Sequence, residues 1–356
     1  MGLKAYLSYP FAKFVEYKNS KWKKDAVKFQ EKIMFELIDS SKKTTFGIDH
    51  SFSKISNYSD FTKNIPIRDY EALKPYVEKI IAGDKDVLWP GKPIYFCKTS
   101  GTTSGEKYIP ISKESMPYHI KSAKDSILSY IAETKNTSIV NGKMIFLQGS
   151  PVLSKTGEIL TGRLSGIVAH HIPSYLKKNR LPSFKANSIN DWEEKVDAIV
   201  EETVSENMSI ISGIPPWVQM YFEKLKNKTG KSINALFPNF NLFIYGGVNF
   251  EPYKKTFEKL IGKQIDGIEL YPASEGFIAY QDSQKEEGML LCVNHGIFYE
   301  FIESVDFFNE APKRINLSDV KIGINYVIIL NTNAGLWGYN IGDTVKFVSI
   351  NPYKII

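Results

Sequence analysis

The chain of 356 residues is long enough for one large domain or two ordinary ones, each with its own hydrophobic core. Its 43% hydrophobic and 24% charged residues are typical of a globular protein, and the net charge of +6 is not gathered into the basic stripe that a nucleic-acid-binding protein needs. Cys97 and Cys292 are the only cysteines, which excludes a disulfide framework and a cysteine zinc site. No apolar run approaches the roughly 18 residues of a membrane span, so we expect a cytoplasmic protein without a membrane or nucleic-acid partner.

Helical patterns dominate the first 90 residues. Apolar side chains recur every three or four residues over 21–39, which predicts an amphipathic helix docked on a larger body. Two further helix starts follow, with Asp60 or Asp69 as a plausible N-cap. We expect Pro66 and Pro75 to break these helices into short pieces.

A loop rich in hydroxyl groups and glycine comes next, between two strand-like apolar runs. Glycine lets the backbone approach a ligand closely, and hydroxyl and N–H groups can surround phosphate oxygens. The loop comprises Thr99, Ser100, Gly101, Thr102, Thr103, Ser104, Gly105, Glu106 and Lys107. It is not a Walker A loop, because only three residues separate Gly101 from Gly105. The loop alone leaves two interpretations open, a triphosphate-binding loop and a solvated hairpin turn.

The middle of the chain alternates strands with helices. Strands are predicted over 144–147, 208–211, 242–245 and 268–271, and helices over 112–133, 191–204, from 217 and over 252–261. This alternation predicts an α/β core with mostly parallel strands, in which ligands gather beyond the carboxyl ends of the strands. Three of these strands end in polar or glycine clusters, namely Gln148-Gly149-Ser150, Gly246-Gly247 and Ala273-Ser274-Glu275. We expect the three strand ends to share one cleft.

The irregular region 157–182 is expected to contribute to a substrate pocket, because loops of this kind often do. Arg163 is a candidate partner for an anionic substrate or for a transition-state phosphate. His170 or His171 either lines the acyl pocket or has an ordinary structural role, and Trp217 is expected to pack rather than to contact substrate. The candidate pocket residues are Gly149, Arg163, Ser165 and His170.

Helical patterns disappear after Met289, and short strands predict an antiparallel sheet or small barrel there. We therefore divide the chain into an α/β core over 1–288 and a β-rich subdomain over 289–356. The subdomain contains a glycine-rich turn that ends in Asp343. A single carboxylate after a glycine is usually only a turn, so its interpretation depends on the rest of the chain.

Three motifs in a fixed order resemble the adenylate-forming superfamily of acyl-CoA synthetase and luciferase-like enzymes. The best resemblance is to the auxin-responsive (Gretchen Hagen) family of acyl-acid-amido synthetases, which includes plant enzymes and bacterial relatives. The family's Ser-Ser-Gly-Thr-Ser-x-Gly lies over 99–105 with threonine at 99 and 103, and its Tyr-x-x-Ser-Glu lies over 271–275. Its Tyr-Arg-x-Gly-Asp lies over 339–343, with Asn340 where plant members have arginine.

This resemblance implies an ATP and Mg²⁺ site. Ser100, Thr102, Thr103 and Ser104, with the backbone of Gly101 and Gly105, would hold the β- and γ-phosphates, and Lys107 would add charge. Glu275 would be the Mg²⁺ ligand, Ser274 would belong to the same site, and Asp343 would accept both ribose hydroxyls. Gly246, Gly247 and Val248 would pass close to adenine, and Tyr271 would stack on it. Catalytic roles would fall to Ser100, Thr102, Thr103 and Glu275.

The resemblance also implies a reaction. The enzyme would adenylate a carboxylic acid, release pyrophosphate and transfer the acyl group to an amine, that of an amino acid. An acyl-CoA ligase and a non-catalytic nucleotide-binding relative are the alternatives. Because the chain ends near the family's hinge, we expect it to hold the large N-terminal domain of a bacterial-type member without the mobile C-terminal domain.

Overall fold

The computed structural model describes residues 3–100, 105–172 and 178–356. Its helices are α1 (Leu3–Lys24), α2 (Ala26–Ser41), α3 (Thr45–Asp49), α4 (Tyr58–Asn64), α5 (Tyr70–Ala82), α6 (Met116–Thr134), α7 (Leu164–His170), α9 (Phe184–Asn187), α10 (Trp192–Thr203), α11 (Pro215–Thr229), α12 (Ile233–Leu236) and α13 (Lys254–Ile261). Its strands are β1 (Tyr95–Ser100), β2 (Glu106–Ile111), β3 (Lys143–Phe146), β4 (Ser154–Thr156), β5 (Ile159–Gly162), β6 (Arg180–Leu181), β7 (Met208–Ser212), β8 (Leu242–Gly246), β9 (Asp266–Ala273), β10 (Gly276–Tyr280), β11 (Met289–Leu291), β12 (Ile297–Glu303), β13 (Asn325–Thr332), β14 (Tyr339–Ile350) and β15 (Tyr353–Ile355).

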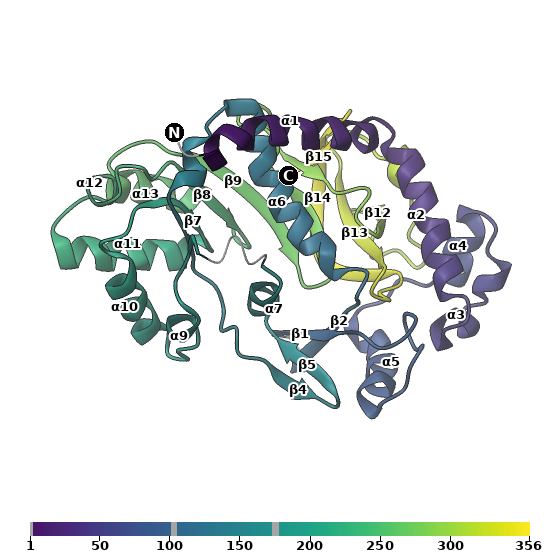
Figure 1. Cartoon of the computed structure of the whole chain (residues 1–356). Helices are drawn as coiled ribbons and strands as arrows, with labels where there is room; N and C mark the ends of the chain where they lie inside the picture. The colour runs from purple at the N-terminus through teal and green to yellow at the C-terminus, as the bar shows by residue number, and fades with distance from the viewer. Residues whose placement is uncertain (1–2, 101–104, 173–177) are drawn as a thin grey trace.

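One large sheet runs through the molecule (Figure 1). Among the described residues it has eleven strands, in the order β12-β13-β14-β15-β11-β10-β9-β8-β7-β3-β6. The strands from β9 to β6 are parallel, whereas those from β10 to β12 pair in antiparallel fashion. The α/β fold with mostly parallel core strands and a β-rich end is therefore confirmed, and the later strands extend the same sheet.

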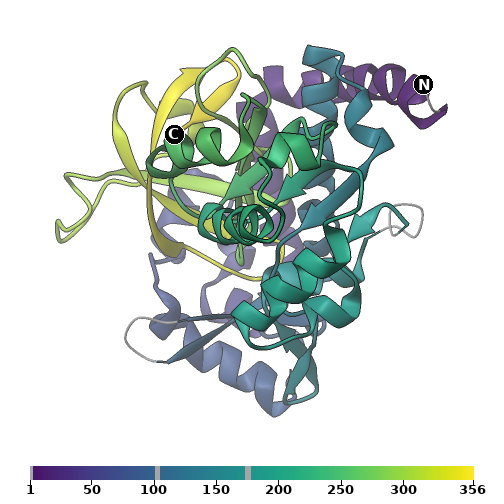
Figure 2. The same ribbon diagram turned by 90° about the vertical axis from the view of Figure 1, so that its left-hand side faces the viewer.

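The parallel half of the sheet is covered by helices on both faces. Ile210 and Ile244 pack with α1 and α6, whereas Ile211 and Phe243, one residue along each strand, pack with α10, α11 and α13. Successive side chains of a strand point to opposite faces, and both faces are apolar here. Figures 1 and 2 show the two groups of helices on opposite sides of the sheet. This double cover leaves the strand ends as the accessible edge.

A second, smaller sheet lies beyond that edge. In the part of the chain that the structure describes it has four strands, in the order β2-β1-β5-β4. β1 and β2 form the predicted hairpin, in which Cys97 pairs with Ile109 and Thr99 pairs with Lys107. Both ends of the glycine- and hydroxyl-rich segment therefore belong to paired strands.

Several details of the N-terminal third differ from the expectation. The helix predicted over 21–39 is divided at Asp25, where α1 has ended at Lys24 and α2 begins at Ala26. Asn57 rather than Asp60 caps α4. Asp69 caps α5 as predicted, but Pro75 lies inside this helix instead of ending it. The missing proline N–H costs one intrahelical bond, and the burial of Leu73 and Val77 on either side maintains the helix.

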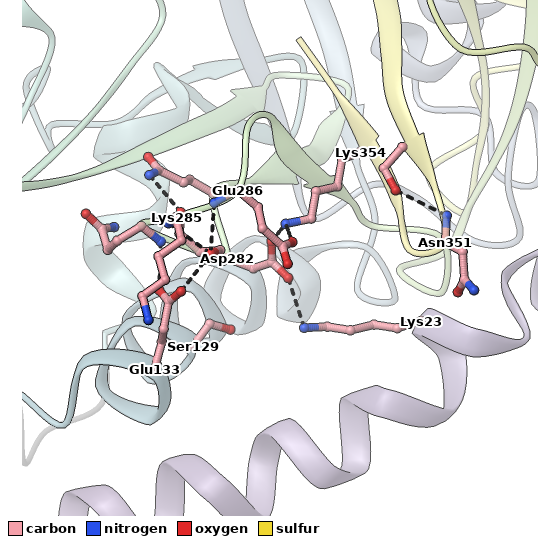
Figure 3. Close-up of polar contacts among 12 residues, drawn as sticks. Lys23, Ser129, Glu133, Asp282, Lys285, Glu286, Asn351 and Lys354 are labelled. Carbon is pink, nitrogen blue, oxygen red and sulfur yellow. Dashed lines mark hydrogen bonds and ion pairs between the residues drawn. The ribbon is translucent and has the colours of Figure 1, made fainter.

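The last strand is anchored to the first helix by buried charges. Lys354 of β15 is 2% exposed, and its Nζ lies 2.8 Å from Asp282 and 2.6 Å from Glu286. The other oxygen of Asp282 lies 3.1 Å from Nζ of Lys23 on α1. Figure 3 shows this chain of contacts. Two ends of the sequence are thereby fixed to one loop after β10.

No helix in the described ranges combines the length and the apolar character that crossing a bilayer requires.

Candidate active site

The three polar strand ends meet at one edge of the large sheet. Strands β3, β7, β8 and β9 are adjacent and parallel, so the segments after residues 146, 246 and 273 leave the sheet on the same side. Figure 1 shows these strands pointing toward α7 and the small sheet. The three segments therefore leave the sheet at one edge, and a cleft shared by all three stays a prediction.

A cavity of about 410 Å³ opens at this edge. It is lined by Lys98, Thr99, Glu106, Gly149, Arg163, Leu164, Ser165, Trp217, Pro272 and Ser274. Its walls come from the β1–β2 hairpin, the start of α7, the start of α11 and the end of β9. The contact between Cys97 Sγ and Ser274 Oγ, 3.1 Å, joins the hairpin to the turn after β9.

A second cavity of about 430 Å³ includes Tyr271 and Asp343. The Tyr271 hydroxyl donates a hydrogen bond to the Asp343 carboxylate. Burial raises the pKa of Tyr271, and its hydrogen bond to Asp343 raises it further. The amide oxygen of Asn340 accepts the N–H of Gly342 at 2.9 Å and so shapes the turn that presents Asp343. The second and third motifs are thus in direct contact, and their predicted roles toward adenine and ribose remain predictions.

Glu275 lies in the turn between β9 and β10. Burial raises its pKa, nearby Lys107 lowers it, and Asp343 raises it. Among the described residues, no lysine or arginine forms an ion pair with Glu275. The carboxylates of Glu275 and Asp343 and the ammonium group of Lys107 therefore lie near one another, and together they carry a net negative charge.

The tip of the phosphate-loop candidate falls outside the described residues. This applies to Gly101, Thr102, Thr103 and Ser104 and to the side chain of Ser100. At the base of the loop, Lys98 and Glu106 form an ion pair of 2.5 Å across the hairpin. Lys107 Nζ lies 5.9 Å from the centre of the Tyr70 ring.

The turn after β8 has its own structural reasons for glycine. A Cβ at Gly246 would lie 2.2 Å from the main-chain oxygen of Leu270, and Gly247 has φ of +81°. Other residues are excluded from these positions by close packing and by backbone conformation. Val248 follows and is 40% exposed. Packing and backbone conformation therefore account for the two glycines, and the contact of this turn with adenine stays a prediction.

The predicted acyl-pocket residues separate into two groups. Gly149, Arg163 and Ser165 line the cavity, where the Gly149 N–H donates to Ser165 Oγ at 3.1 Å. His170 instead pairs through Nε2 with the main-chain oxygen of Pro151 at 2.7 Å. The structure therefore favours the ordinary structural role that was left open for this histidine.

Two cations near the cavity were not among the candidate residues, and Trp217 packs as expected while also lining the cavity. Lys195 Nζ lies 3.4 Å from the main-chain oxygen of Gln148, and Arg180 donates to the Gln148 side chain at 2.5 Å. Trp217 lines the cavity and also packs on Trp192, with ring centres 4.2 Å apart. Lys195 was detectable, because it occupies an apolar-face position of its helix.

Two family models match the sequence. The GH3 family N-terminal domain matches residues 18–184, and the GH3 family central domain matches residues 290–354. The chain belongs to the GH3 family. This confirms the resemblance drawn from the three motifs, and with it the enzyme class, an acid–amino acid ligase that forms an amide through an acyl adenylate.

The curated relatives that resemble this chain are named as enzymes that conjugate acids to amino acids. Jasmonoyl–L-amino acid synthetase JAR4 of Nicotiana attenuata is 25% identical over 393 residues, covering 91% of this chain and 67% of the relative. Indole-3-acetic acid-amido synthetase GH3.3 of Arabidopsis thaliana is 19% identical, covering 89% of this chain and 64% of the relative. The GH3 chain described here thus spans about two thirds of the length of such relatives.

Solved structures confirm the fold. GH3.15 acyl acid amido synthetase superposes with a TM-score of 0.79 at 14% identity, covering 97% of this chain and 70% of that one. A 2-hydroxyisobutyryl-CoA ligase superposes with a TM-score of 0.62 at 11% identity, covering 93% and 66%. The GH3 chain therefore has the fold of adenylate-forming enzymes.

Proposed function

We propose that this edge of the sheet binds ATP and a small carboxylic acid, forms the acyl adenylate, and supports transfer of the acyl group to an amino acid. The observation that carries the proposal is the contact between Tyr271 and Asp343, with Glu275 close by. It unites two motifs that the sequence keeps far apart. The membership of the chain in the GH3 family supports the same reaction.

The reaction needs positioning and charge neutralisation more than it needs a nucleophilic side chain, because a carboxylate attacks the α-phosphate of ATP. In our proposal the loop 99–105 holds the β- and γ-phosphates and Lys107 adds a positive charge. Asp343 accepts the ribose hydroxyls, and Tyr271 holds Asp343 in place. The acid lies in the cavity beside Gly149, with its carboxylate toward the phosphates.

The charges at Glu275 fit a magnesium ion. Magnesium is usually held in proteins by one or two carboxylates together with phosphate oxygens of the substrate. Glu275 supplies such a carboxylate without a lysine or arginine ion-pair partner in the described part of the chain. When bound, Mg²⁺ would supply charge neutralisation on the phosphates.

We further propose that the protein works in the cytoplasm and that residues 1–288 and 289–356 are parts of one large domain. The eleven-stranded sheet, which is continuous across the described residues of both segments, supports their assignment to one domain.

ATP–pyrophosphate exchange tests the proposal. The assay is run with Mg²⁺ over a panel of aryl and aliphatic acids, and exchange is expected only with acids that fit the cavity. Addition of amino acids or of coenzyme A then separates an amido synthetase from an acyl-CoA ligase. No exchange with any acid, together with no ATP binding, would contradict the proposed function.

A further inference from the structure

Three cationic side chains converge where β3 ends. Lys195 and Arg180 both bind Gln148, one through its main-chain oxygen and the other through its side chain. Arg163 flanks the next residue, because a Cβ built on Gly149 would lie 3.2 Å from Arg163 Cδ. Cations from α10, from β6 and from the start of α7 therefore surround two consecutive residues.

In the part of the chain that the structure describes, none of these three cations forms an ion pair with a carboxylate. The remaining residues, 1–2, 101–104 and 173–177, contain no acidic side chain. The ion pairs of the described residues therefore include none with the cationic group.

Lys195 is buried and Arg180 is partly buried, whereas Arg163 is exposed at the cavity. Lys195 is 3% exposed, and burial lowers its pKa, with a further decrease from Arg163. Burial lowers the pKa of Arg180 to about 10, and its Nε is buried without a hydrogen-bond partner. Buried charges without partners are unfavourable, and perturbed groups of this kind gather at functional sites. An anion from outside the chain would relieve this cost.

The cationic group adjoins the acyl cavity. Arg163 and Trp217 line the cavity directly. Trp192 stacks on Trp217, and Lys195 Nζ lies 5.8 Å from the centre of the Trp192 ring. The one carboxylate that lines this cavity in the described structure, that of Glu106, is paired with a lysine of the same hairpin. The cavity wall thus carries a free guanidinium with a buried ammonium close behind it.

This inference rests on the proposed function, which already places one carboxylate in the cavity. The reacting carboxylate brings a single negative charge and gives it up when it becomes an acyl adenylate, and the proposed function places the ATP phosphates at the loop 99–105 and Lys107 rather than at Lys195. We propose that Arg163 and Lys195 bind a second carboxylate, one that does not react. Arginine matches a carboxylate with two parallel hydrogen bonds, and lysine adds a point charge. This carboxylate belongs either to a dicarboxylic acyl donor or to the amino acid acceptor.

Paired substrates in two assays test the inference. Dicarboxylic acids are compared with their monoamides in ATP–pyrophosphate exchange, and amino acids with their amides in amide formation. In Lys195→Met and Arg163→Gln, KM for the carboxylate-bearing member of a pair should rise about 10- to 100-fold, as expected for a lost charged hydrogen bond. KM for the uncharged member should change much less. A change in the exchange assay assigns the carboxylate to the donor, and a change only in amide formation assigns it to the acceptor.

Controls separate charge from packing. Lys195→Arg should retain the preference for the carboxylate. Lys224→Met removes a lysine that pairs with Asp197 of α10 on the solvent side and should leave all kinetics unchanged. Thermal unfolding checks that Lys195→Met, a change of similar volume, still folds. An equal change of KM for both members of every pair would overturn the inference. A wild-type protein that exchanges no acid would instead contradict the proposed function itself.

Discussion

Tyr271 and Asp343 lie 72 positions apart in the sequence, yet the hydroxyl of one donates a hydrogen bond to the carboxylate of the other. Neither residue is unusual by its local context, since tyrosine often ends a strand and aspartate often follows a glycine. Their contact at the rim of a cavity, with Glu275 close by, makes the functional interpretation stronger than either motif does alone.

Asp343→Asn should weaken ATP binding. The amide no longer accepts two hydroxyl hydrogen bonds with a full negative charge, and charged hydrogen bonds contribute about 1.5–3 kcal/mol. KM for ATP in the exchange assay should therefore rise about tenfold or more. Tyr271→Phe removes only the hydrogen bond that positions Asp343, so its effect should be smaller. Wild-type KM values in Asp343→Asn would mean that the third motif is misplaced.

Glu275→Gln should abolish Mg²⁺-dependent exchange while leaving the fold intact. The glutamine keeps the shape of the side chain but is a poor ligand for a hard cation. Exchange rates at several Mg²⁺ concentrations provide the measurement, and circular dichroism checks the fold. Glu251→Gln, at an exposed glutamate after β8, is the matched control and should behave as wild type. Normal exchange in Glu275→Gln would remove the metal role from this residue.

At the scale of elements, buried ion pairs connect segments that the local sequence does not relate. Glu300 of β12 is fully buried and accepts hydrogen bonds from Arg314 and from Asn331 of β13, and from Tyr58 of α4 at 3.1 Å. This network holds the N-terminal helices on the antiparallel end of the sheet.

Glu300→Leu should destabilise the protein strongly. The substitution leaves the nearly buried guanidinium of Arg314 without its carboxylate, and breaking a buried pair costs about 3–5 kcal/mol. Urea unfolding measures the difference. Lys32→Ala breaks an exposed pair with Glu36 on α2 and should cost less than about 1 kcal/mol. Similar losses for both variants would show that the buried network contributes little.

At the scale of the whole molecule, two buried histidines link stability to pH. Burial lowers the pKa of His119 to about 4, and burial together with nearby Lys121 lowers that of His295 to about 3. Below about pH 6.5 the unfolded chain binds protons at both imidazoles and the folded chain does not. The free energy of unfolding should therefore fall as the pH decreases from about 6.5 toward 4, with no such contribution above pH 6.5.

Substitution of one histidine measures its share of the pH dependence of the free energy of unfolding. Each histidine contributes up to about 1.4 kcal/mol per pH unit inside this window. His119→Gln removes one titrating group and should flatten the dependence by about that amount, as measured by urea unfolding between about pH 7 and about pH 5. An unchanged slope would show that His119 is not neutral in the folded protein.

Much of the architecture was predictable because it depends on short-range patterns. The hairpin around residues 99–107, the parallel strands and the cap at Asp69 follow from alternation, periodicity and local hydrogen bonding. The continuation of α5 through Pro75 was not predictable, because burial of its apolar face outweighs a local preference.

The sequence by itself determined the family, the order of the three motifs and the class of reaction, since these depend on residue identity and spacing. The tertiary structure decided which side chains meet. It joined Tyr271 to Asp343, turned His170 toward a main-chain oxygen, and gathered Lys195, Arg180 and Arg163 at the end of one strand. Such contacts depend on the register and packing of segments that are distant in the sequence, so they cannot be predicted from local sequence patterns.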